Sequence, residues 1–168
     1  MPYDRSLDHR ELAGLGTAYK DVIRDHLIAI PLTEELDGDE MTTLIGFVRA
    51  YRIPGDEVLF NEGDAAGYLG IVISGRMRVT KRNLAGEARE LYVMGPGKVF
   101  GEMAILDQEP RSATLTTLEP TLIAVLSRDN FYRLCSERAG LGVKLLLKIS
   151  RVLSQRLRRM SGQFVDKI

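Results

Sequence analysis

Residues 100–114 read Phe-Gly-Glu-Met-Ala-Ile-Leu-Asp-Gln-Glu-Pro-Arg-Ser-Ala-Thr, and these residue types are hard to explain by folding alone. Gly101 can adopt a positive φ and lets a ligand approach the backbone closely. The short apolar turn that follows presents free N–H groups at its start, where an anion is stabilised. Arg111, behind Pro110, carries a planar fork of donors that matches phosphate oxygens. The segment therefore predicts a loop that binds a phosphate.

Glu102 would repel a phosphate at the same site, so it needs a different role. An acidic residue in a dinucleotide site accepts hydrogen bonds from the hydroxyl groups of a ribose. The ligand that suits both residues is a sugar joined to a compact phosphate monoanion. The alternative is that Glu102 and Arg111 form an ion pair with each other across a surface loop.

The segment resembles the phosphate-binding cassette of the cyclic nucleotide-binding domain family, found in catabolite activator protein, cyclic-AMP-dependent kinase regulatory subunits and cyclic nucleotide-gated channels. The resemblance rests on Phe100–Glu102, the apolar Met103–Ile105 and Pro110–Thr114. It implies that Glu102 binds the ribose 2′-hydroxyl and that Arg111 binds the cyclic phosphate, with no cofactor or metal. The ligand-binding residues expected from it are Gly101, Glu102, Met103, Ala104, Arg111, Ser112 and Ala113.

The base of the ligand is less clear from the sequence. In resembling domains a hydroxyl residue after the cassette arginine can favour guanine, and Ser112 has a hydroxyl. A serine at this position also occurs in relatives that bind cyclic AMP. We favour cyclic AMP over cyclic GMP.

Short β-rich runs surround the segment at intervals of about ten residues, separated by Gly, Pro, Asn and Asp. Such spacing is typical of a sandwich, jelly roll or barrel. Pro54 and Gly55 occupy the centre of an expected type II turn. The expected strands are 57–60, 68–74, 76–81, 90–94, 98–100, 113–117 and 121–127.

Helices are expected on both sides of these strands. Apolar spacing and a capping box of Asp8 and Glu11 predict one helix from Asp8 to Ile30, which packs on the domain or docks a partner. A second capping box, Asp37 with Glu40, predicts a helix over 41–50. The fold class is thus α+β: an antiparallel β-roll, jelly-roll-like, with flanking N-terminal helices and a long C-terminal helix.

Two helices follow the last strand, over 129–137 and from a break near Gly140–Gly142 to about Gly162. The second carries an apolar stripe, and in the resembling family this helix covers the base and often forms a dimer. Its basic face is either solvated or contacts nucleic acid. The stripe comprises Leu145, Ile149, Val152, Leu153, Leu157, Met160 and Phe164, and the basic face Lys144, Lys148, Arg151, Arg156, Arg158 and Arg159. The expected division is an N-terminal extension (1–32), the binding roll with flanking helices (33–138) and a lid or dimerisation helix (139–168).

Composition excludes several classes. Twenty-three basic and 23 acidic residues give a formal net charge of zero, so nothing attracts the whole chain to nucleic acid or membrane. Cys135 is the only cysteine, and the two histidines, His9 and His26, precede the expected roll, which argues against metal and haem sites. Without a signal sequence or a long apolar run, we expect a cytoplasmic protein.

The function expected is a non-enzymatic regulatory protein that binds a cyclic nucleotide and signals to a partner by rearranging its helices. The partners expected are an unidentified effector protein and a second copy of the chain, joined through the C-terminal helix. Direct DNA binding is not expected, because no residues remain for a helix-turn-helix after the long helix. The alternatives are an interaction scaffold that does not bind nucleotide and a truncated transcription regulator.

Overall fold

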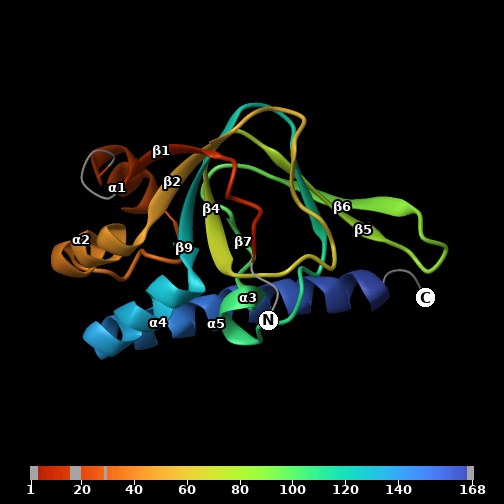
Figure 1. Ribbon diagram of the computed structural model, residues 1–168. Helices are drawn as coiled ribbons and strands as arrows, with labels where there is room; N and C mark the ends of the chain where they lie inside the picture. The colour runs from red at the N-terminus through yellow and green to blue at the C-terminus, as the bar shows by residue number, and fades with distance from the viewer. Residues whose placement is uncertain (1–3, 16–19, 29, 166–168) are drawn as a thin grey trace.

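The computed structural model describes residues 4–15, 20–28 and 30–165. In these parts of the chain, nine strands form two antiparallel sheets that face each other as a roll, with helices packed outside (Figure 1). One sheet has the order β1 (Glu11–Leu15), β2 (Arg49–Ile53), β9 (Thr121–Ser127), β4 (Tyr68–Ser74), β7 (Val99–Phe100). The other has the order β3 (Val58–Phe60), β8 (Thr114–Thr117), β5 (Met77–Arg82), β6 (Ala88–Met94). The predicted fold class is confirmed.

Strand β4 separates two hydrophobic clusters, which explains its near-continuous apolar sequence. Tyr68 and Val72 face the interior of the roll, whereas Leu69, Ile71 and Ile73 face the helices. A strand buried on both faces has no polar side to alternate with its apolar side. Strand β4 therefore contributes side chains both to the interior of the roll and to the core between the sheet and the helices.

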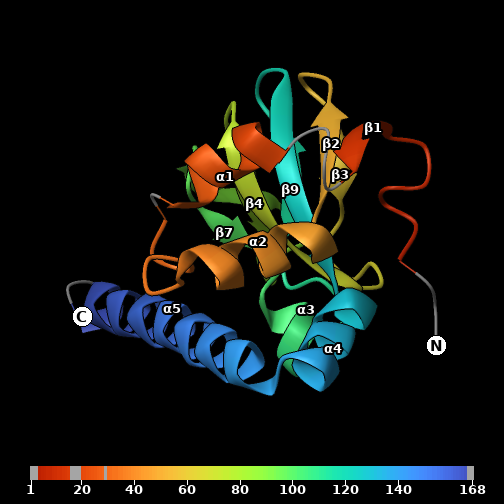
Figure 2. The same cartoon turned by 90° about the vertical axis from the view of Figure 1, so that its left-hand side faces the viewer.

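Five helices are described, and α1 (Lys20–Ile28) and α2 (Gly38–Phe47) lie against the outer face of the first sheet (Figure 2). The predicted capping box at α2 is confirmed: the Asp37 carboxylate accepts from the Asp39 and Glu40 backbone N–H groups, and the Glu40 carboxylate from that of Asp37. Helices α3 (Met103–Leu106), α4 (Arg128–Glu137) and α5 (Ala139–Val165) complete the set. No described helix is both long and apolar enough to cross a membrane.

The expected helix from Asp8 to Ile30 is wrong in its first half. Residues 11–15 form β1, which pairs with β2 at the edge of the first sheet, and α1 begins only at Lys20. Helix 41–50 is likewise too long, since α2 ends at Phe47 and residues 49–53 pair with β9 as β2. In both places hydrogen bonds to a distant strand outweigh the local apolar spacing.

The predicted type II turn at Pro54-Gly55 is also wrong. Such a turn needs a positive φ at Gly55, but the left-handed residue is Asp56, with φ 57°. Gly55 is small for another reason: a Cβ there would lie 3.1 Å from the Glu119 Cα. The glycine permits two loops to pass close to one another.

The break between α4 and α5 falls at Arg138 and not at the predicted glycines. Gly142 lies inside α5, where a Cβ would meet the Cys135 Sγ at 2.6 Å, so the glycine permits close packing of the two helices. Of the predicted stripe on α5, Leu145 and Ile149 are buried in the helix–sheet core and Val152 and Leu153 are partly buried. Leu157 is exposed, and the side chains of Met160 and Phe164 lie outside the described residues.

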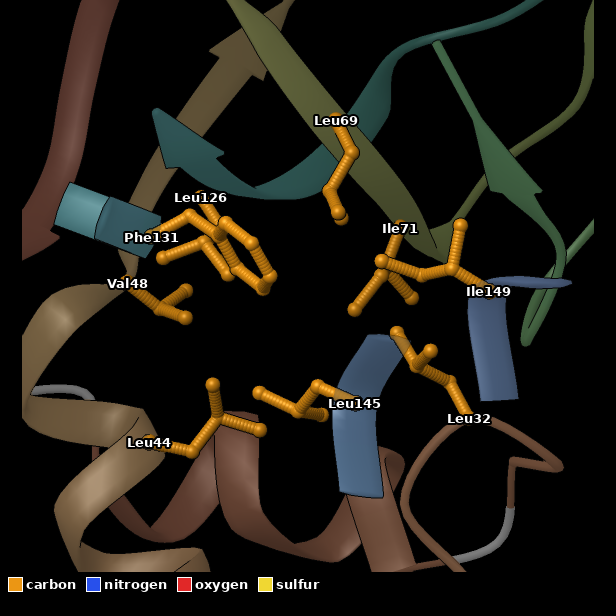
Figure 3. A pocket seen from close by; sticks show the side chains of 9 residues that line it. All are labelled: Leu32, Leu44, Val48, Leu69, Ile71, Leu126, Phe131, Leu145 and Ile149. Carbon is orange, nitrogen blue, oxygen red and sulfur yellow. The ribbon is translucent and has the colours of Figure 1, made fainter. Parts of the chain in front are cut away.

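A small apolar void of about 10 Å³ lies between the first sheet and α2, α4 and α5 (Figure 3). Its walls are hydrocarbon side chains, among them Leu69, Phe131 and Leu145. Such a space barely admits one water molecule and offers it no polar partner. The void belongs to the core and cannot hold a phosphate.

Candidate functional site

The predicted cassette spans the turn after β7, the short helix α3 and the loop that enters β8. Gly101 has φ 66°, a conformation that L side chains rarely adopt. A Cβ at this position would lie 2.4 Å from the Arg111 Nη1 and 2.9 Å from the Tyr68 carbonyl oxygen. The positive φ expected at Gly101 is confirmed, and the group that lies beside this glycine is the Arg111 guanidinium. The approach of a ligand to the Gly101 backbone stays a prediction.

Arg111 is buried, with 4% of its surface exposed. Its Nη1 donates to the Tyr68 carbonyl oxygen at 3.0 Å, and its Nη2 donates to the Asp4 carboxylate at 2.8 Å. The guanidinium carbon lies 4.1 Å from the Phe60 ring centroid and 4.3 Å from that of Tyr68, within the range of cation–π attraction. The Arg111 Nε is buried without a hydrogen-bond partner among the described residues.

The backbone around Arg111 is fixed by the turn between β3 and β4. The Gly63 N–H donates to the Arg111 carbonyl oxygen at 2.8 Å, and the Arg111 N–H donates to the Asp64 carbonyl oxygen at 2.9 Å. Asp64 also accepts from the Asn61 N–H through its side chain, which closes the turn. The cassette arginine thus projects from a rigid pair of loops.

Glu102 is buried as well, with 3% of its surface exposed, and its partner comes from α5. The Arg156 Nη1 forms an ion pair with the Glu102 Oε1, and the Arg156 Nη2 donates to the Val99 carbonyl oxygen. Glu102 and Arg111 therefore pair with different residues and not with each other. The alternative of a Glu102–Arg111 ion pair on a surface loop is wrong.

The other predicted site residues differ in exposure. Ala104 is buried, Met103 is 42% exposed and Ser112 is exposed. Ala113 packs against the cluster inside the roll, and the Ser112 carbonyl oxygen accepts from the Lys81 Nζ at 2.6 Å. Gly101 and Arg111 are brought into direct proximity. The ligand contacts assigned to these two residues and to the other five stay predictions.

Sequence reasoning missed three partners of the cassette: Asp4, Tyr68 and Arg156. Burial raises the pKa of the Tyr68 phenol, whose hydroxyl is hydrogen-bonded to the Ser6 Oγ at 2.9 Å. Arg156 stands out in the sequence only as one member of a basic helix face. Nothing in the sequence around Asp4 indicates that it contacts Arg111, because the two residues lie 107 positions apart.

The basic face of α5 is largely neutralised by acids of the same chain. Lys144 binds Glu40, Lys148 binds Glu34 and Glu35, and Arg151 also binds Glu35. Hydrogen bonds to these glutamates raise the pKa of the buried Lys148 ammonium. The face is therefore not simply solvated, and these pairings weaken its interpretation as a surface for nucleic acid.

Two solved structures are similar to this chain. A protein solved from Methylobacillus flagellatus, a cyclic nucleotide-binding domain, is 27% identical with a TM-score of 0.86, covering 100% of this chain and 97% of that one. The regulatory domain of Toxoplasma gondii PKA, solved with cAMP, is 33% identical with a TM-score of 0.63 over 70% of this chain and 44% of that one.

Among curated proteins, the cyclic AMP receptor protein of Thermus thermophilus is 33% identical over 104 residues, which are 62% of this chain. The chain spans about half the length of that relative, 48%. The sequence model of the cyclic nucleotide-binding domain matches residues 51–138, which include the whole cassette. The chain belongs to the cyclic nucleotide-binding domain family.

Proposed function

We propose that this chain binds cyclic AMP in preference to cyclic GMP, and that Arg111 holds the cyclic phosphate while Glu102 accepts hydrogen bonds from the ribose. The observation that carries the proposal is the buried Arg111 Nε without a partner among the described residues. Native structures rarely leave a buried donor unsatisfied, and a charged one is costly. A phosphate oxygen would satisfy it. The Toxoplasma domain solved with cAMP supports the choice of nucleotide.

The cassette is joined to the helices by two contacts through which binding can be transmitted. Ile105, on α3, is buried in the cluster that also contains Leu145 and Ile149 of α5. Arg156 links the same helix to Glu102 and to the end of β7. A ribose that bonds to Glu102 changes the environment of the Arg156 ion pair, and thereby favours one position of α5 over another. Met103, which is largely exposed, contributes less to this coupling than Ile105.

The role proposed is regulatory and not catalytic, with an effector protein as the receiver of the helix movement. The curated relative is a receptor protein by name, and the family is a binding domain. An interaction scaffold that does not bind nucleotide is the second candidate. The buried Glu102 and Arg111 argue against it, since an unused site has no reason to retain an unsatisfied guanidinium donor.

Isothermal titration calorimetry with cyclic AMP and cyclic GMP tests the proposal. The wild-type chain should bind both, and cyclic AMP more tightly. Arg111→Lys keeps a positive charge beside Asp4 but lacks the Nε–H and the planar fork, so its affinity should fall by about 30-fold or more. Glu102→Gln should lower the affinity by a smaller factor. The absence of heat and of any thermal shift at millimolar ligand would reject the receptor in favour of the scaffold.

A further inference from the structure

Both oxygens of the Asp4 carboxylate accept hydrogen bonds from the protein. Its Oδ2 accepts from the Arg111 Nη2 at 2.8 Å and from the Gly67 N–H at 2.9 Å. Its Oδ1 accepts from the Ser6 N–H at 3.1 Å and from the Ser6 hydroxyl at 2.7 Å. The Asp4 side chain is 8% exposed and that of Arg111 is 2% exposed. Because the ion pair is buried and its carboxylate accepts several hydrogen bonds, Asp4 is held in a defined position, unlike a residue in an exposed ion pair.

The rest of the N-terminal segment, residues 4–10, is docked on the same side of the roll. Leu7 packs against the hydrophobic cluster inside the roll. Arg10 forms an ion pair with Glu57, and its Nη2 donates to the Val58 carbonyl oxygen at 2.8 Å. These contacts hold the segment in place independently of the Asp4–Arg111 pair.

The position of Asp4 favours a role in supporting an anionic ligand over competition with it. The protein groups that donate to its carboxylate belong to Arg111, Gly67 and Ser6, and none is a backbone N–H of the cassette. A Cβ on Gly67 would lie 3.1 Å from the Asp4 Cβ, so the glycine makes room for the Asp4 side chain. Gly101 lies beside Nη1, whereas Asp4 accepts from Nη2, and Nε is left without a partner among the described residues.

We propose that Asp4 is a positioning residue of the anion site, and that the N-terminal segment is part of the binding site. Asp4 and the Tyr68 carbonyl oxygen each accept a hydrogen bond from one terminal nitrogen of Arg111 and fix the rotation of the guanidinium. The Nε–H then remains for the phosphate of the ligand. This inference rests on the proposed function, because it assigns Asp4 a role at the same arginine.

The experiment compares Asp4→Asn, Asp4→Glu and Asp8→Asn with the wild type by calorimetry with cyclic AMP. Asp4→Asn keeps the shape of the side chain but removes the charge, and the affinity should fall by about 10- to 100-fold. Asp4→Glu restores the charge and should recover part of that loss. Asp8 lies in the same segment and is exposed, so Asp8→Asn should bind as the wild type does. A melting curve of each variant controls for folding.

A second measurement reads the guanidinium directly, without nucleotide. The ¹⁵N–¹H signal of the Arg111 Nε, assigned by its loss in Arg111→Lys, should be protected from exchange in the wild type and in Asp8→Asn. In Asp4→Asn it should broaden or shift as the side chain gains freedom. In the wild type it should also shift when cyclic AMP is added.

The outcomes separate the inference from the function on which it rests. A wild-type chain that binds cyclic AMP, together with an Asp4→Asn variant of unchanged affinity and unchanged Nε signal, overturns the inference and leaves the function intact. Tighter binding by Asp4→Asn also overturns it, because Asp4 would then compete with the ligand. If the wild type binds no nucleotide, the proposed function fails, and the role given to Asp4 fails with it.

Discussion

Arg111 is a buried cation whose charge is compensated from several sides at once. Removing a guanidinium from water costs several kcal/mol, which one ion pair alone rarely offsets. Here the carboxylate of Asp4, the Tyr68 carbonyl oxygen and two aromatic rings all face the charge. The Nε–H lacks a partner within the described parts of the chain, so the site is incomplete at this atom.

At the same scale, Gly101→Ala should lower the free energy of unfolding more than the replacement of another glycine that also has a positive φ. The new methyl group meets both an unfavourable φ and the Arg111 guanidinium. Gly86 is the matched control, since it has φ 82° but nothing within 4 Å of the place that a Cβ would take. Gly86→Ala should cost about 1–2 kcal/mol, the penalty of the left-handed backbone alone. Urea denaturation of both variants measures the difference, and equal losses would contradict the crowding at Gly101.

The residues of the cassette could be predicted from the sequence because their local spacing is distinctive, whereas their partners could not because those are distant. Gly101 and Arg111 both lie in the connection between β7 and β8, so a short window of sequence contains both. Asp4 and Arg156 reach the site only when the whole roll has formed, so no local pattern indicates them. The sequence shows the positive charge of Arg156 but not the carboxylate that it meets.

Helix α5 is an element with two differently anchored halves. The first half is buried through Leu145 and Ile149 and held by the Lys148 pairs, whereas the second half contacts the cassette through Arg156. Beyond the partly buried Val152 and Leu153, the second half contacts the roll through the side chain of Arg156, so this part of the helix is suited to move when the Arg156–Glu102 pair changes.

Arg156→Gln should therefore loosen the second half of α5 in the absence of ligand. Hydrogen exchange of residues 151–159 should become faster in this variant, and cyclic AMP should no longer change it. Arg159→Gln, at an exposed position of the same helix, serves as the control and should leave the exchange unaltered. If the Arg156→Gln variant still shows the same ligand-induced change, the helix is coupled to the cassette by another route.

The ion pair of Lys148 with Glu35, which holds the first half of α5, should weaken in acid. A hydrogen bond from Lys148 lowers the pKa of Glu35 below its ordinary 4.5. A lowered folded-state pKa gives stability that is fully present above the unfolded value and is lost as the pH falls through the lowered one. The stability difference between the wild type and Glu35→Gln should thus be largest near neutral pH and shrink below 4.5. Denaturation midpoints at several pH values measure it, and a difference independent of pH would contradict the anchor.

At this scale the strands of the roll are predicted well, because turns punctuate them at regular intervals. The elements that the prediction missed are β1, which contains residues with helical apolar spacing, and β2, whose first residues lie at the end of the expected helix 41–50. Their state is decided by pairing with β9 and with each other, which is information held elsewhere in the chain.

At the scale of the whole molecule, α5 presents an exposed stripe that its own domain leaves uncovered. Val143, Leu147 and Leu157 are 56%, 54% and 66% exposed. With Ser150, Ser154 and Ser161 they follow alternate steps of four and three residues, the spacing of a coiled-coil seam. This face shares only Leu157 with the predicted stripe, whose other described members are buried or partly buried on the domain. It is the surface on which the predicted pairing with a second copy would occur.

A single charge in the stripe should separate such a pair. Leu147→Glu places like charges opposite each other across a seam and should shift the chain from dimer to monomer in sedimentation experiments. Leu84→Glu, at the fully exposed tip of the β5–β6 hairpin, is the control and should leave the mass unchanged. A wild-type chain that is monomeric at all concentrations would disprove the dimer.

The most direct test of the central claim is a crystal structure of the chain with cyclic AMP. We expect a phosphate oxygen within hydrogen-bond distance of the Arg111 Nε, the ribose hydroxyls on Glu102, and Asp4 still bonded to the Arg111 Nη2. A nucleotide bound elsewhere, or one that leaves the Arg111 Nε without a partner, would contradict it.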